Sequence, residues 1–168
     1  LGSGSSIGVP RVDGYFGLCD PKNIKNHRTR CSALISIDDY KVLIDTSPDL
    51  RAQLIKAKVK NINEVFYTHM HADQTHGINE LRLFYLLYKK KINVYANRDT
   101  LKYLKNTFSY CFTNTHNYPA FLKLNNLKKK HTLKDKIIVE PFTVDHGKVK
   151  SILYKINNSC AYVSDVNK

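Results

Sequence analysis

The chain has 168 residues, which is enough to bury one sizeable core but too few for two ordinary domains. Hydrophobic residues make up 42% and charged residues 24%, as in ordinary globular proteins, and no apolar run is long enough to cross a bilayer. Lys and Arg total 27 against 14 acidic residues, and this +13 charge is spread along the chain, which fits an A- and T-rich coding bias as well as a polyanionic partner.

The first residue is Leu1, and the turn-like run Gly2 to Ser6 follows at once, as though an opening strand had been cut. We therefore expect a chain trimmed at its start. No charged-then-apolar leader of the secretory type is seen, which favours a cytoplasmic protein. The scattered cysteines form no Cys-x-x-Cys pair and predict reduced core thiols rather than disulfides: Cys19, Cys31, Cys111 and Cys160.

Strands and helices alternate in the first half. Residues 33–37 and 40–44 are β-branched runs around an acidic turn and predict a β-hairpin. Ser47 then caps a helix that carries proline in its first turn. Residues 65–67 fit a short buried strand that ends at His69. The buried stripe of the helix is predicted to comprise Leu50, Leu54 and Ile55.

Helical spacing of apolar residues predicts a helix over 77–90, with Ile78, Leu81, Tyr85 and Tyr88 on its buried side. A strand over 92–95 and a helix beginning at 99–103 follow. The stretch 111–130 shows the least periodicity and is predicted to include an irregular excursion. Further strands are predicted at 137–139, 142–144, 151–156 and 160–163.

Potential metal ligands gather where the predicted strands end. His69 and His71 are one residue apart, so in an extended segment both imidazoles leave the backbone on the same side. Asp73 follows on that side, and His146 and Asp165 end later strands. Histidine and carboxylate ligands suit zinc, manganese or iron, with a position left for water. The alternative for each residue alone is an ordinary solvated loop or turn residue.

The order of five motifs resembles the metallo-β-lactamase-fold hydrolases, in particular the branch that includes phosphoribosyl cyclic phosphodiesterase and lies close to tRNase Z. These motifs are residues 2–6, Leu43 to Asp49, Thr68 to Asp73, Phe142 to Gly147, and Ser164-Asp165. The resemblance covers essentially the whole chain. It implies a layered α/β fold, a four-layer αβ/βα sandwich, as a single domain over 1–168 that is incomplete at its C-terminus.

The resemblance also implies roles. His69, His71 and His146 correspond to the imidazole ligands of a first metal, Asp165 to a bridge between two metals, and Asp73 to a ligand of the second. Asp73 and His76 are the predicted catalytic residues, with His76 as a proton donor or substrate contact. A helix-start residue without a catalytic task is the alternative for His76. Asp45 is expected to orient the site from behind a ligand histidine.

The chain departs from the family pattern at two places. Gln74 stands where the family usually has a histidine, and its amide oxygen is a poor ligand for zinc. We therefore expect zinc, or manganese or iron, in one tight site, with the second site weak. Only Cys19 lies where the phosphodiesterase branch carries a cysteine cluster, so no structural zinc is predicted.

The resulting hypothesis is a phosphodiesterase that uses a metal-bound hydroxide on a small phosphodiester substrate. A tRNase Z-like nuclease acting on RNA is the alternative enzyme, favoured by the basic balance. A truncated, non-catalytic remnant is the alternative from another class, favoured by Gln74. No membrane partner is expected, and a homodimer is left open.

Overall fold

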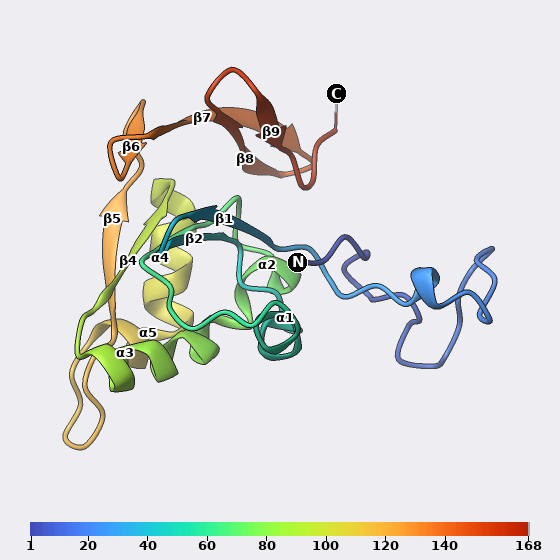
Figure 1. The fold of residues 1–168 in the computed structure, drawn as a ribbon, viewed down its shortest axis with the longest axis horizontal. Coiled ribbons are helices and arrows are strands. Elements are labelled where there is room, and N and C mark those ends of the chain that lie inside the picture. The colour runs from blue at the N-terminus through green and yellow to red at the C-terminus, as the bar shows by residue number, and fades with distance from the viewer. Residues whose placement is uncertain (168) are drawn as a thin grey trace.

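The computed structural model describes residues 1–167 and contains two β-sheets (Figure 1). The first sheet has the strand order β1-β2-β3-β4-β5, and the second has the order β6-β7-β8-β9. The strands of the first sheet are β1 (Ala33–Ile37), β2 (Tyr40–Ile44), β3 (Glu64–Phe66), β4 (Ile92–Ala96) and β5 (Leu122–Asn126). Those of the second are β6 (His131–Leu133), β7 (Ile137–His146), β8 (Val149–Ile156) and β9 (Cys160–Tyr162).

All the α-helices lie between β2 and β5 in the described chain. In Figure 1 α1, α3 and α5 lie on one side of the first sheet, and β7 to β9 lie on the other. The helices are α1 (Leu50–Lys56), α2 (Ala72–Thr75), α3 (Arg82–Tyr88), α4 (Arg98–Thr107) and α5 (Ser109–Phe112), with 3-10 turns η1 (Ile24–Asn26) and η2 (Ile78–Leu81).

Successive side chains of the central strands point to opposite faces of the first sheet, and this divides the hydrophobic core in two. On β2, Leu43 joins a helix-side core with residues such as Leu50 and Val65, whereas Val42 and Ile44 join an intersheet core. The intersheet core draws on both sheets and contains no helical residue: Ile37, Val42, Ile44, Phe66, Leu133, Val139, Ile152 and Tyr154. Because successive side chains of a strand point to opposite faces, the first sheet is covered on both sides.

Strands β2 to β5 run parallel and β1 closes the sheet as an antiparallel hairpin partner of β2. The second sheet is antiparallel throughout. Residues 1–167 therefore form three layers of the predicted sandwich: one layer of helices and two β-sheets. The layered α/β class is confirmed.

The hairpin and the strand β4 were predicted correctly, but several details were wrong. A helix follows the hairpin as expected, but α1 begins at Leu50 with Asp49 as its N-cap, so Ser47 does not cap it and the proline precedes its first turn. Ile55 and Tyr88 are 62% and 56% exposed rather than buried, because Gln53 and Phe84 take the inward positions. An irregular segment does lie between α5 and β5, but the strand β5 itself was not expected, and the runs 137–139 and 142–144 are one strand, β7. Pro141 is tolerated within β7 because β6 pairs only with residues 137–139, which leaves that side of the strand free.

The N-terminal segment leaves the body as an arm, blue in Figure 1, and returns at β1. Backbone bridges from Gly2 to Ser32 and from Val9 to Arg28 hold its two limbs together. The cysteines are free thiols, but only Cys111 is buried, so the expectation of core thiols was wrong for the exposed Cys19 and Cys160. Within residues 1–167, no helix has the length and apolarity needed to span a membrane.

Candidate metal centre

The loops that follow β2 and β3 build one half of the site. These strands are parallel neighbours, so their carboxyl ends lie at the same edge of the sheet. The loop after β2 is clamped to the segment after β3, because Thr46 N donates to Gln74 O at 2.7 Å and Gly77 N donates to Thr46 O at 2.9 Å. A Cβ on Gly77 would overlap the Ser47 carbonyl oxygen, so the close approach requires glycine.

Asp45 holds this half of the site in place through hydrogen bonds with Thr68. Its side chain is fully buried, and its backbone φ of 61° lies in the left-handed region that aspartate tolerates better than most residues. Oδ1 accepts from Thr68 N at 2.8 Å and Oδ2 accepts from the Thr68 hydroxyl at 2.9 Å. Burial raises the pKa of Asp45 well above its ordinary value, and the two hydrogen bonds from Thr68 act in the opposite direction.

Thr68 connects Asp45 to His69. The Thr68 hydroxyl oxygen lies 3.0 Å from His69 Nδ1. An ionised Asp45 can only accept, so it takes the single hydroxyl proton of Thr68, and the His69 contact then requires Nδ1–H to donate to Thr68. This tautomer leaves a lone pair on His69 Nε2. Asp45 therefore reaches His69 only through Thr68, so the orienting role expected for Asp45 would act through this hydroxyl.

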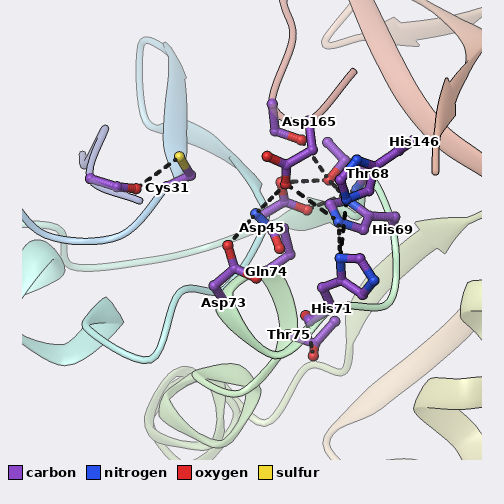
Figure 2. Close-up of polar contacts among 12 residues, drawn as sticks. Cys31, Asp45, Thr68, His69, His71, Asp73, Gln74, Thr75, His146 and Asp165 are labelled. Carbon is purple, nitrogen blue, oxygen red and sulfur yellow. Dashed lines mark hydrogen bonds and ion pairs between the residues drawn. The ribbon is translucent and has the colours of Figure 1, made fainter. Parts of the chain in front are cut away.

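The ring nitrogens of His69, His71 and His146 converge on one point (Figure 2). His69 Nε2 lies 3.0 Å from His71 Nδ1, and His146 Nε2 lies 3.3 Å from the same His71 atom. The three potential ligand atoms all lie within 4.8 Å of one another. His146 reaches this point from the end of β7, in the other sheet.

The three imidazoles differ in burial. His69 is fully buried, His146 is half-buried, and His71 is exposed. Burial, followed by the proximity of His71 and His146, lowers the pKa of His69 to about 4. His69 is therefore neutral at physiological pH, which is the form that binds a metal.

Two carboxylates border the triad. Asp165 Oδ2 lies 3.4 Å from His69 Nε2. Asp73 is nearly buried, and its Oδ2 accepts from Gln74 Nε2 at 3.0 Å. The same amide nitrogen lies 3.4 Å from Asp165 Oδ2, so Gln74 stands between the two carboxylates (Figure 2).

His76 contacts Thr75 and Phe108 rather than the triad histidines or the two carboxylates. It is exposed at the end of α2, with Nδ1 3.1 Å from the Thr75 hydroxyl and its ring edge-on to Phe108. Sequence reasoning missed Thr68 and Ser164, whose hydroxyl donates to Thr68 Oγ1 at 3.2 Å. Both residues directly precede a predicted ligand and stand in motifs of the family resemblance, and these are the signals that could have found them.

Residues 40–167 match the family model described as the beta-lactamase superfamily domain. The chain belongs to the beta-lactamase superfamily. Within it, the chain is 29% identical to a crystal structure described as a new diphosphatase from the PhnP family, with a TM-score of 0.85 over 99% of this chain and 65% of that one.

Two further structures show the same fold at lower identity. Zn²⁺-bound PqqB from Methylobacterium extorquens is 17% identical with a TM-score of 0.68, over 93% of this chain and 60% of that one. The short form of human tRNase Z is 19% identical with a TM-score of 0.57, over 80% of this chain and 61% of that one.

A curated relative from Porphyromonas gingivalis, named octanoyltransferase, is 34% identical over 99% of this chain. The match spans only 34% of that protein, so the chain covers about a third of its length. The chain also spans less than two thirds of the PhnP-family diphosphatase.

The superfamily implies a divalent metal, and the triad fits one. With zinc–nitrogen bonds of ~2.1 Å in a tetrahedral site, neighbouring ligand nitrogens stand about 3.4 Å apart. Two of the three separations between the histidine nitrogens, 3.0 and 3.3 Å, are close to this edge length, and the third is within 4.8 Å. A neutral, buried His69 with its Nε2 lone pair aimed at the other rings is the expected state of such a ligand.

Proposed function

We propose that this chain is the metal-binding part of a hydrolase that cleaves phosphoric esters, with a small phosphodiester as the substrate. The convergence of the His69, His71 and His146 nitrogens is the observation that carries the proposal. Zinc is the proposed ion, with manganese and iron as alternatives, because imidazole and carboxylate ligands suit all three.

A divalent ion in this position supplies a water of lowered pKa and a positive charge for the phosphoryl oxygens. The chain's residues would hold and orient that ion. Asp45 and Thr68 fix the His69 tautomer, and His71 and His146 complete the imidazole set. Asp165, 3.4 Å from His69 Nε2, is the proposed carboxylate ligand.

The catalytic roles proposed for Asp73 and His76 rest on their places in the loop after β3. Asp73 is linked by Gln74 to Asp165 and would orient that carboxylate. His76 is exposed on the same short segment and would meet a substrate from the solvent side. Its contact with the Thr75 hydroxyl fixes one ring nitrogen and leaves Nε2 for a proton transfer.

The phosphoric ester class is supported by the 29% identity to a PhnP-family diphosphatase across nearly all of this chain. RNA is the second candidate substrate, and the net charge of +13 is the observation that favours it. The two candidates differ in salt dependence, because binding to a polyanion weakens steeply as salt rises.

Hydrolysis of bis-p-nitrophenyl phosphate by metal-loaded protein tests the proposal. We expect turnover by the wild type, loss of at least about 100-fold in His69→Ala, and no loss in His116→Ala, an exposed histidine of the loop between α5 and β5. Equal rates in the two variants would overturn the proposed site. Bound metal without turnover on either this ester or an RNA oligonucleotide would overturn the proposed activity.

A further inference from the structure

Gln74 occupies an unusual position for a neutral side chain. It is fully buried, yet it lies between the carboxylates of Asp73 and Asp165. Its backbone is fixed on both sides, because Gln74 N donates to His71 O and Gln74 O accepts from Thr46 N. The side chain therefore enters the site from a rigid segment.

The orientation of the amide follows from its neighbours. Nε2 carries two protons, and it lies 3.0 Å from Asp73 Oδ2 and 3.4 Å from Asp165 Oδ2. A flipped amide would direct Oε1 at two carboxylate oxygens, which repel it. Oε1 is buried and makes no hydrogen bond within residues 1–167, so the contact with the carboxylates determines which way the amide points.

One carboxylate oxygen links the amide to the triad. Asp165 Oδ2 lies 3.4 Å from His69 Nε2 and 3.4 Å from Gln74 Nε2. On one side this oxygen faces the His69 imidazole nitrogen, and on the other it faces an N–H donor. A cation bound between Asp73 and Asp165 would need oxygen distances of about 2.0–2.2 Å, in the space that the amide nitrogen fills.

We propose that the Gln74 amide takes the place of a second metal ion by donating one N–H to each carboxylate, so that the chain binds a single ion at the histidine triad. This inference rests on the proposed function in one respect, namely that an ion binds at the histidine triad. Gln74 acts here as a positioning residue, since it holds Asp165 near the triad without adding charge. The residues around Gln74 do not fit a second metal.

Metal content after loading with excess zinc and removal of free ion tests this inference. We expect about one ion per chain in the wild type and about two in Gln74→His, because an imidazole supplies the missing nitrogen ligand beside two carboxylates. Gln74→Glu is the near-isosteric second variant. It replaces the N–H donor by a third carboxylate, so it also should bind about two ions.

Thermal unfolding in chelator adds a readout that a purely structural role would not produce. Gln74→Glu should melt well below the wild type in chelator and recover on adding zinc, because three neighbouring carboxylates repel one another until a cation binds. Gln74→Asn, which keeps an amide but shortens it, should stay near one ion per chain.

The outcomes separate the two proposals. About two ions in the wild type, or about one in both Gln74→His and Gln74→Glu, would overturn the role of the amide and leave the hydrolase proposal standing. No bound ion in the wild type would overturn the hydrolase proposal, and the single-ion claim with it. Loss of the ion in His69→Ala with retention in Gln74→Asn is the expected control result.

Discussion

His69 and His146 face the same point from very different settings. His69 follows a buried strand, is fully buried itself, and is fixed through Thr68 to Asp45. His146 ends β7 beside the turn at Gly147, where a Cβ would meet open space, and its Nδ1 has no hydrogen-bond partner within residues 1–167. The comparison suggests a rigid half of the site on the first sheet and a less constrained half on the second.

Glycine-to-alanine substitutions test this difference with the largest expected effect. Gly77→Ala should lower the free energy of unfolding by about 2–3 kcal/mol, because its Cβ overlaps the Ser47 carbonyl oxygen in the clamped half. Gly147→Ala should cost only about 1 kcal/mol, from its φ of 58° alone. Urea unfolding measures both, and a cost at Gly147 equal to or above that at Gly77 would contradict the comparison.

Thr68 offers the next test, since it connects Asp45 to His69. Thr68→Val keeps the side-chain shape but removes the hydroxyl, and we expect a loss of about 1–2 kcal/mol in stability and about 10–100-fold in metal affinity. Thr68→Ser keeps the hydroxyl and serves as the control. If valine and serine bound zinc equally well in a competition titration, the orientation of His69 would not depend on Thr68.

The smallest expected effect is a pH dependence of stability that comes from His131, beside the intersheet core. His131 packs against Phe66 and Tyr95, and its Nε2 accepts from Lys128 N at 3.0 Å. Burial, helped by the Lys128 charge, lowers the pKa of His131. The unfolded chain therefore binds the proton more readily, so this contribution is complete above an ordinary histidine pKa of about 6.5 and is lost as pH falls below it.

Urea unfolding at about pH 7.5 and about pH 5.5 measures this contribution, expected to be below about 1 kcal/mol. His131→Gln should show a smaller loss of stability on acidification than the wild type. Because His69 titrates in both proteins, the difference between them isolates His131. An identical pH dependence in the two proteins would mean that His131 does not titrate in this range.

Features of this molecule that depend on residues close together in the chain could be predicted from the sequence. The hairpin β1–β2 and the pair His69 and His71 were predictable because alternation and spacing fix which side a residue faces. β5 was missed because its apolar residues Leu122 and Leu124 are followed by asparagines, which favour turns.

The long-range parts of the site could not be derived from spacing. His146 joins the triad only because the second sheet packs on the first. Its membership was predicted from the family resemblance, because residue spacing alone does not indicate it. The Gln74 amide was expected to weaken a second site, but its contacts with Asp73 and Asp165 depend on residues far apart in the chain. The Asp45–Thr68–His69 connection likewise requires two strands to pair.

The position of the bound ion tests the central claim most directly. Anomalous diffraction at the zinc edge, from crystals of the zinc-loaded protein, should show one strong peak about 2.1 Å from His69 Nε2, His71 Nδ1 and His146 Nε2. A peak coordinated by other residues, or no peak at the triad, would contradict the assignment of these histidines as the metal centre.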